Sequence, residues 1–444
     1  MIKTILTYLI LLFTTFVLFN CGHLESLPTV SEAEQGDTAY VHIFPDWEKD
    51  EYGFNTPKDV LVGDDGYIFI ADSGNTRIVV LDQAGMVVTD DEFGNNFQDL
   101  DEIKVPGKEN IEPLQLSQDS KMNLLFIDGS NQIYAWNQYY NNAGIRYVSK
   151  EVILYNSDLD KYIYSDRMDS LSYYLGNGYT LYDAQLDSSE ELINSIMAPH
   201  VIFDGNDPKN YEFVDDYGDT RYSKIVDIAV FGGDYSNLLY IMDKRYDRIV
   251  KLKYVVKQLL FMGKDSSLSV AFDYECIFSE VATSKGSGAG FIMEPTSIAT
   301  DISGNIYFTQ TGGVYPSHGI SAGSYRTLFN PLDEDDILDT ERFPFARNIG
   351  VDFRGIIYVV DAINNIVQAF DSKGTFQRNI GTTLVDVDSS AVIEVADILS
   401  NPEAIFIDEN IVYIADTGNS RIVRFQYSIL TQQNLQNFQE YQDP

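Results

Sequence analysis

The sequence contains little cysteine and little histidine. Its 444 residues include only Cys21 and Cys276, together with four histidines. Two cysteines cannot build a disulfide framework or a cysteine zinc site. The histidines are also too scattered along the chain to predict a histidine metal cluster: His23, His42, His200 and His318. Disulfide scaffolds and zinc sites of these types are therefore excluded.

Positive charge is also scarce. The chain has 30 Lys and Arg against 67 Asp and Glu, which gives a formal net charge of −37. Such a surface repels phosphate backbones, so nucleic-acid binding is not expected. Calcium, cationic groups or a basic protein partner are compatible with this acidity, although a simple solvated surface accounts for it as well. No cofactor is predicted, and calcium stays one possibility.

Long hydrophobic runs are almost missing, and the one that occurs lies at the N-terminus. Residues 5–19 form a hydrophobic stretch after Lys3, which is the pattern of an export signal. Cys21 comes next, in the context Leu18-Phe19-Asn20-Cys21. This resembles a bacterial lipobox, although Asn20 departs from the usual Gly, Ala or Ser. The resemblance implies cleavage before Cys21 and lipidation of its thiol and new amine. An uncleaved signal anchor and a cleaved signal without lipid are the alternatives.

This reading divides the chain into four parts. Residues 1–20 are the expected lipoprotein signal peptide, 21–38 a lipidated flexible tether, 39–428 the folded body and 429–444 a polar C-terminal tail. The protein is expected to be exported and anchored through Cys21 to the cell membrane or the outer membrane, facing outside the cytoplasm. No other segment reaches 18 consecutive apolar residues, so no second span is expected.

The body is built from repeated segments. Four of the copies begin at a proline, and each copy runs through short β-rich stretches, which turn signals such as Asp64-Asp65-Gly66 separate. Small antiparallel sheets of this kind cannot bury both faces alone, but radial stacking lets neighbours cover each other. The strongest copies are 57–82 and 402–425, followed by 347–371 and a unit beginning at 295, then by 113–136 and 225–252, and the weakest copy is 161–183.

The shared pattern Pro…Asp…Gly…Ile-Tyr-Val-Ala-Asp…Asn…Arg-Ile resembles the NHL repeat. The resemblance implies an all-β chain with a single β-propeller of NHL type and four-stranded blades. Seven units are counted, and six is the alternative because 161–183 is doubtful. The last unit stops after its third strand, and residues 39–44 precede the first unit as a lone strand-like segment. We therefore expect this N-terminal strand to complete the last blade and close the ring.

Certain polar residues recur at one point of the repeat. An active site is needed once, whereas a fold needs its fasteners in every blade, so these residues are predicted to be structural. Their carboxylates can cap the turn between the second and third strands and meet the arginine. The predicted structural residues are Asp72, Asn75, Arg77, Asp128, Asp243, Asp361, Asp416, Asn419 and Arg421. No catalytic residue is predicted.

Connection lengths predict a binding face. The turn between strands two and three shares one face of the disc with the link to the next blade. The segments assigned to that face are long and acidic: 89–112, 185–222, 262–294 and 311–345. Long ordered loops on a rigid scaffold often carry binding residues. The candidate residues are Tyr315, His318, Tyr325, Asp333, Asp335 and Asp336. A self-packed, solvated loop is the alternative, and no metal ligands are assigned.

Three functions are compatible with these observations. The preferred one is a membrane-anchored binding or scaffold protein for a protein or glycan partner. The second is a metal-dependent propeller enzyme, because similar propellers include sugar-lactone hydrolases and a hydroxyglycine amide lyase. Those enzymes use a metal near the central channel, and equivalent ligands cannot be assigned here. The third is an accessory lipoprotein of a solute transport system. Fold alone does not decide between them.

Overall fold

The computed structural model describes residues 38–88, 111–137, 148–165, 177–187, 199–206, 223–233, 236–262, 268–283, 285–286, 291–311, 320–322, 337, 343, 345–381 and 399–429. These residues divide between two compact units, Met1–Val41 with Tyr427–Pro444, and His42–Gln426. In the first unit, the ring of Tyr40 lies 5.5 Å from that of Tyr427. The second unit contains the repeats. Among the described residues, no helix has the length and apolarity needed to cross a membrane.

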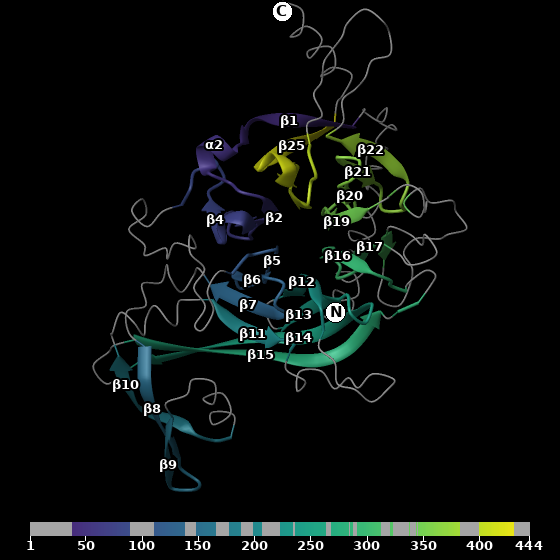
Figure 1. The fold of residues 1–444 in the computed structure, drawn as a ribbon. Helices are drawn as coiled ribbons and strands as arrows, with labels where there is room; N and C mark the ends of the chain where they lie inside the picture. The colour runs from purple at the N-terminus through teal and green to yellow at the C-terminus, as the bar shows by residue number, and fades with distance from the viewer. Residues whose placement is uncertain are drawn as a thin grey trace, which may run out of the picture. The chain divides into compact units, whose positions relative to one another are not determined.

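The described residues form six sheets, which we number in chain order (Figure 1). The first sheet contains β2 (Pro57–Val62), β3 (Ile68–Asp72) and β4 (Arg77–Leu81). The second contains β5 (Gln115–Gln118), β6 (Asn123–Ile127), β7 (Gln132–Asn137) and β11 (His200–Asp204). The third contains β12 (Ile225–Gly233), β13 (Ser236–Asp243), β14 (Arg248–Met262) and β15 (Leu268–Thr283), and three strands of an insertion, described below, extend it beyond β15.

The fourth, fifth and sixth sheets follow the same antiparallel order. The fourth contains β16 (Pro295–Thr300), β17 (Ile306–Gln310) and β18 (Ile320–Ala322). The fifth contains β19 (Ala346–Val351), β20 (Ile357–Asp361), β21 (Ile366–Phe370) and β22 (Phe376–Ile380). The sixth contains β23 (Ala404–Asp408), β24 (Ile411–Asp416), β25 (Arg421–Ile429) and β1 (Thr38–Trp47). The helical elements are short: α2 (Lys49–Tyr52), η1 (Ser73–Asn75) and η5 (Thr417–Asn419).

The first strands of the six sheets form a closed ring. Each contacts the next in the order β2, β5, β12, β16, β19, β23, and β23 contacts β2 again. This arrangement is a β-propeller with its inner strands around a common centre (Figure 1). The expectation of an all-β propeller is thus met. Antiparallel pairing puts the turns between second and third strands, and the links between sheets, at one end of the ring. We call this end the crossover face and the opposite end the hairpin face.

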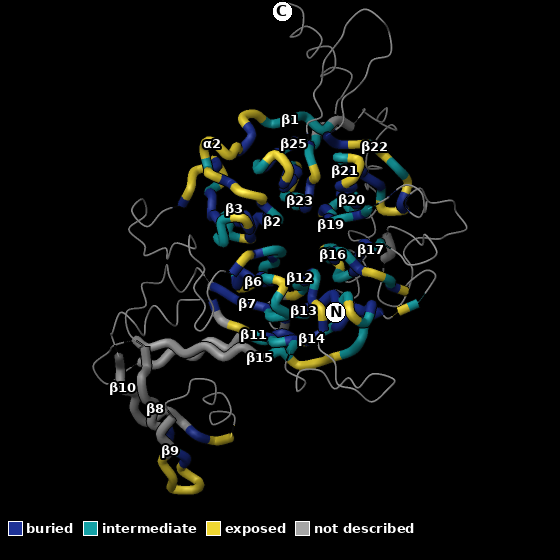
Figure 2. The backbone as a smooth tube through the Cα atoms, viewed as in Figure 1, coloured by how far each residue is buried: buried dark blue, intermediate teal, exposed yellow. Residues whose placement is uncertain are grey.

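The strands are buried on both sides because each sheet packs between two neighbours. All five residues of β3 are buried, as are those of β20 (Figure 2). Successive side chains of a strand point to opposite faces, so they enter different interfaces. Phe69 packs with residues of the second sheet, whereas Ile70 packs with residues of the sixth. Alternating polar residues are therefore absent from these strands, and burial of each large side chain contributes about 2 kcal/mol.

The N-terminal strand closes the ring, as the sequence predicts. β1 lies beside β25 and is the outermost strand of the sixth sheet. A second contact repeats a bond made elsewhere in the ring. The hydroxyl of Ser73 donates to the carbonyl of Pro113 in the segment entering the second sheet. In the same way, the hydroxyl of Thr417 in the sixth sheet donates to the carbonyl of Pro57 in the first. The last sheet thus joins the first through the same contact that joins the first to the second.

The prediction of seven blades is not supported. The doubtful unit 161–183 contains β9 (Lys161–Ser165) and the start of β10 (Thr180–Asp187). Both strands pair with β8 (Val148–Asn156), which itself meets β15 through the parallel pair Val270 and Val148. In sequence, these three strands come between β7 and β11, which are the third and fourth strands of the second sheet. It is an insertion into a blade, because none of its described strands belongs to the inner ring.

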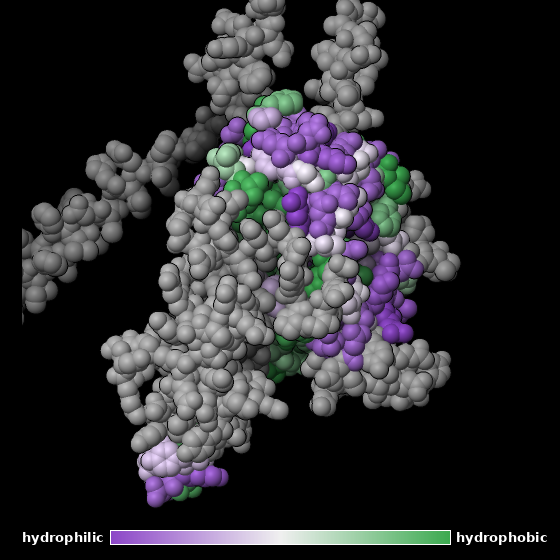
Figure 3. Space-filling view, turned by 60° about the vertical axis from the view of Figure 1, so that its left-hand side comes forward, coloured by the Kyte–Doolittle hydropathy of each residue, from purple (hydrophilic) through white to green (hydrophobic). Residues whose placement is uncertain are grey.

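Three of the predicted long loops contain strands, because segment 311–345 holds the short strand β18 and two others hold longer ones. Segment 262–294 holds β15, which pairs with β14 over almost its whole length. Segment 185–222 holds β11, which completes the second sheet. Hydrogen bonding to a neighbouring strand outweighs the weak local repeat pattern in both segments. Across the view in Figure 3, the described surface is mostly hydrophilic, with separate hydrophobic areas.

Candidate functional site

A cavity of about 270 Å³ lies at the centre of the propeller. All six inner strands line it, through residues that include Val60, Leu116, Ile228, Ile298, Ile349 and Ile405. At the crossover end, its lining includes three polar side chains from alternate sheets: Asp59, Asp227 and Asn348. The inner strands have no hydrogen-bonded neighbour on the side that faces the axis. At the central cavity a propeller can therefore present backbone and side-chain polar groups together.

These three polar residues connect neighbouring sheets. Asp59 accepts a hydrogen bond from the N–H of Leu116 in the second sheet, at 2.6 Å. Asp227 accepts one from the N–H of Ile298 in the fourth sheet at 2.8 Å, and Asn348 accepts one from Ile405 in the sixth at 3.2 Å. Each bond replaces part of the backbone pairing that an inner strand lacks on that side. The polar end of the cavity therefore also holds the ring together.

Burial changes the acidity of the two carboxyl groups. Loss of solvent raises the pKa of Asp227 to about 7, although hydrogen bonds from Ser297, Ile298 and Ile228 oppose the rise. Burial also raises the pKa of Asp59 well above its usual value, and the charge of Asp227 adds to this effect. Asp227 therefore changes its charge close to neutral pH, and Asp59 loses its proton less readily than an ordinary aspartate.

A bulge places one residue of each of four inner strands just outside this polar end. The register of the first and second strands skips one position in the first, third, fourth and fifth sheets. The residues at the skipped positions are Lys58, Val226, Thr296 and Arg347. Bulges of this kind turn a side chain away from its ordinary direction. Two of the four side chains are cations.

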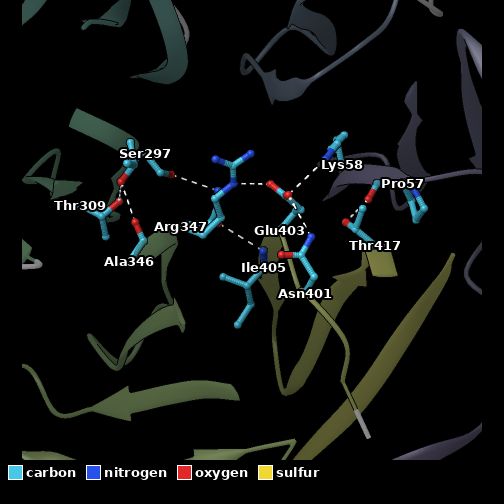
Figure 4. A network of polar contacts seen from close by, with 12 residues as sticks. Pro57, Lys58, Ser297, Thr309, Ala346, Arg347, Asn401, Glu403, Ile405 and Thr417 are labelled. Carbon is cyan, nitrogen blue, oxygen red and sulfur yellow. Dashed lines mark hydrogen bonds and ion pairs between the residues drawn. The ribbon is translucent and has the colours of Figure 1, made fainter. Parts of the chain in front are cut away.

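Glu403 lies between these two cations (Figure 4). It directly precedes β23, and its Oε1 lies 3.1 Å from Nζ of Lys58. Its Oε2 accepts a hydrogen bond from Nε of Arg347, and Nδ2 of Asn401 also donates to its Oε1 at 3.3 Å. We call Lys58, Arg347 and Glu403 the opening triad. Its members come from the first, fifth and sixth sheets and are linked only by folding, because Lys58 and Glu403 are 345 residues apart in sequence.

The predicted structural residues lie at the crossover face, away from the central cavity. Asp72 is fully buried and accepts bonds from Nδ2 of Asn75 and Nε of Arg77, both at 2.7 Å. Asp416 accepts the corresponding bonds from Asn419 and Arg421, both at 2.8 Å.

The other repeat carboxylates bond to nearby groups of their own sheets. Asp243 accepts from Nε of Arg248 at 2.9 Å. Asp128 accepts from the hydroxyl of Tyr134 at 2.9 Å, and Asp361 from Nδ2 of Asn364 at 2.7 Å. Each of the five repeats that have this carboxylate therefore uses it locally, with a different donor where Asn or Arg is missing.

The residues predicted for the binding face lie outside the described residues, and so does the lipidation site. These are Tyr315, His318, Tyr325, Asp333, Asp335 and Asp336, together with Cys21. Within the part of the chain that the structure describes, no group of three or more His, Cys, Asp or Glu side chains is arranged to hold a metal ion.

Sequence reasoning missed the polar end of the cavity and the opening triad. A signal was present in the repeat itself. The two positions after its first residue read Lys58-Asp59, Thr296-Ser297 and Arg347-Asn348 in three units, and Glu403-Ala404 in the last. Variable polar residues at one fixed point of an otherwise apolar inner strand mark the side chains at the end of the axis.

Comparisons with known proteins give no family. No protein-family model matches the chain, and no curated protein matches it in sequence. Among solved structures, a streptogramin B lyase is 11% identical, with 88% of this chain and 97% of that one covered and a TM-score of 0.38.

Two further structures have similar values. A gluconolactonase from Xanthomonas campestris is 9% identical, with coverages of 89% and 91% and a TM-score of 0.39. A protein of unknown function from Bacteroides thetaiotaomicron is 11% identical, with coverages of 88% and 77% and a TM-score of 0.45. The propeller assignment rests on the pairing of the strands and the ring of inner strands, because these TM-scores are all below 0.5.

Proposed function

We propose that this protein is a membrane-anchored, extracytoplasmic propeller of NHL type that binds a protein or glycan ligand at the central opening of its crossover face. One observation carries the proposal. Side chains from three different sheets meet as the opening triad at the polar end of a preformed central cavity. Preformed, concave sites with a few oriented polar groups are typical of ligand binding.

Connectivity supports the choice of this face. The links between successive sheets enter the inner strands at the crossover end, which is the end where the opening triad lies. The hairpin face has short turns instead, such as 63–67 and 352–356. A ligand on the crossover face would therefore contact both the rigid ring and the linking segments.

The anchor is part of the proposal and has its own test. We expect Cys21→Ser to abolish incorporation of labelled palmitate and to move the protein from the membrane fraction to the soluble fraction. Cys276→Ser is the matched control, since this thiol lies on β15 of the folded body. Palmitate labelling that survives in Cys21→Ser would reject the anchor without affecting the binding site.

Binding at the opening can be tested by blocking one face at a time. Lys58→Cys and Lys373→Cys, each in a Cys276→Ser background, would carry the same bulky maleimide on the crossover and the hairpin face. The purified full-length protein is then applied to arrays of peptides and glycans. We expect labelling at position 58 to abolish the signal of bound probes and labelling at position 373 to leave it unchanged. Equal signals in both labelled variants would reject the opening as the binding site.

Catalysis is a second candidate, favoured by the acidity of Asp227. A carboxyl group with a pKa of about 7 at the end of a cavity can exchange a proton at neutral pH. If the protein is an enzyme of this kind, wild-type protein hydrolyses a panel of esters and lactones and Asp227→Asn does not. Lack of turnover by wild-type protein, with and without added divalent cations, would remove this candidate.

A further inference from the structure

Arg347 is held in one orientation at the central opening. Its Nε donates to Glu403, and its guanidinium carbon lies 5.7 Å from the centre of the Phe345 ring. The terminal guanidinium nitrogens point away from Glu403 in Figure 4. The side chain is 38% exposed, so these nitrogens can be reached from solvent. This is a preorganised fork of hydrogen-bond donors.

We propose that Arg347, assisted by Lys58, binds an anionic group of the ligand at the opening. The inference rests on the proposed function, whose ligand it assigns to a chemical class. A guanidinium presents paired N–H groups that match a carboxylate or a phosphate, and ion-assisted hydrogen bonds are about twice as strong as neutral ones. Lys58 adds a second positive charge from the neighbouring sheet.

The local charge at the opening is opposite in sign to that of the whole chain. The protein carries a formal charge of −37, whereas the opening triad holds two cations against one carboxylate. Burial raises the pKa of Asp59 well above its usual value and that of Asp227 to about 7, which reduces the negative charge that these two acids contribute near the opening. An anion approaching the acidic surface would therefore find its favourable position at the axis.

Glu403 is an internal competitor for the ligand. Its carboxylate already bonds to both cations, and only 9% of its side chain is exposed. A ligand anion bound to the outer side of Arg347 must share the positive charge with it. Removal of the charge of Glu403 should therefore strengthen anion binding, while removal of Arg347 should weaken it. A merely structural ion pair would give no such opposite pair of effects.

The cavity limits what can follow the anionic group inward. Its volume of about 270 Å³ accommodates a small chemical group and no folded segment. The anion is therefore a terminal or isolated group, such as the carboxylate at one end of a ligand. The polar residues Asp59, Asp227 and Asn348 lie beyond it at the mouth of the cavity.

Isothermal titration of the purified full-length chain with three small probes tests this assignment. The probes are tricarballylate, its uncharged triamide and inorganic phosphate. We expect wild-type protein to bind tricarballylate or phosphate and not the triamide. Arg347→Gln should weaken anion binding about 10-fold and Lys58→Met about 3-fold, since one charge-assisted contact is lost in each. Glu403→Gln should strengthen it by a similar factor.

Arg354 provides a matched control on the hairpin face. It also bonds through Nε to a carboxylate, that of Asp352, and its guanidinium carbon lies 5.5 Å from the Phe353 ring. Arg354→Gln should leave the affinity for the anions unchanged. Thermal unfolding of each variant shows whether it is folded, and if Glu403→Gln is not, the comparison of Arg347→Gln with Arg354→Gln still decides.

The results separate this inference from the proposed function. Equal binding of the triamide and of tricarballylate, lost in Arg347→Gln, would overturn the anionic class and leave the opening as the binding site. Anion binding that is unchanged in Arg347→Gln would show an adventitious ion only. Absence of anion binding by wild-type protein would reject the inference. The maleimide-labelled variants on peptide and glycan arrays would then still test whether the crossover face binds a ligand.

Discussion

The first and sixth sheets use nearly the same sequence for different purposes. In both, a buried aspartate accepts a hydrogen bond from a backbone N–H of the segment that enters its own sheet. Asp72 accepts it from Asn55, and Asp416 accepts it from Ser400. The arginines then differ. Arg77 donates to the carbonyl of Tyr52 at 2.7 Å, whereas Arg421 reaches the carboxylate of Asp46 on the closing strand at 2.8 Å.

The difference shows how a repeat becomes a ring. A local motif fixes the turn in both sheets, but only in the sixth does it extend to a strand from the other end of the sequence. Asp46 also lies 2.6 Å from the His42 ring, and Arg424 donates to the carbonyl of Pro45. The closing strand is therefore held by side chains as well as by its pairing with β25. We expect substitutions at the closure to cost more than their counterparts in the first sheet.

The largest difference is expected for Trp47→Ala. This side chain is only 2% exposed, packs near Tyr413, and has the guanidinium of Arg424 above its ring at 4.2 Å. We expect the free energy of unfolding in urea to fall by about 4 kcal/mol. The counterpart in the first sheet is Val88→Ala, at the outer edge of that sheet, with an expected loss of about 2 kcal/mol. Equal losses would mean that closure is no more critical than any outer edge.

The two arginines should differ next. Arg421→Met keeps the aliphatic stem but leaves two buried carboxylates, Asp46 and Asp416, without their shared cation. We expect a loss of about 3 kcal/mol in unfolding free energy. Arg77→Met removes the bonds to Asp72 and to the neutral carbonyl of Tyr52, so about 2 kcal/mol is expected. Urea unfolding at low and high salt measures both, and a larger loss for Arg77→Met would contradict the comparison.

The side-chain contacts between neighbouring inner strands use carboxyl groups in some sheets and an amide in the fifth, and this difference predicts a pH dependence. Asn348, which bonds to the sixth sheet, does not titrate, whereas the pKa of Asp227 at the matching position of the third sheet is raised to about 7. A raised folded-state pKa stabilises the fold below the unfolded value, and this stabilisation is lost as the pH rises through 7. Between pH 5 and 8 the loss is roughly 3 kcal/mol.

Asp227→Asn, which makes the third sheet resemble the fifth, removes this dependence. The unfolding free energy of the variant relative to wild type should therefore rise as the pH increases from 5 to 8. A constant difference across this range would show that Asp227 titrates alike in the folded and unfolded chain. Urea unfolding at several pH values supplies the measurement.

The smallest effects are expected where the two sheets are equivalent. Ser73→Ala and Thr417→Val each remove one hydroxyl that donates to a proline carbonyl of the next sheet. We expect each to lower the unfolding free energy by about 1 kcal/mol. Similar values would support the view that this contact is the same in both places, while a much larger loss for Thr417→Val would indicate an additional role in closure.

Local patterns predicted what depends on neighbours in sequence. The β-rich copies at 57–82 and 402–425 became sheets because short apolar segments between turn residues have few other ways to bury themselves. The incomplete last unit and the isolated strand 39–44 also predicted their pairing. The unit 161–183 was misread because tyrosine-rich segments and turns also occur in an ordinary hairpin. Its strands pair with β8 because the edges of β8 are open to them in the folded chain. A repeat pattern in the sequence does not show which strand edges will be open.

The sequence alone thus determined the propeller class, the turn chemistry around Asp72 and Asp416, and the identity of the closing strand, because each depends on short-range pattern or on a missing strand. Tertiary structure decided the number of sheets in the described chain, the insertion between β7 and β11, and the meeting of Lys58, Arg347 and Glu403. It also decided the acidity of Asp227, since burial depends on all the inner strands together. Residues hundreds of positions apart become neighbours only when the ring closes.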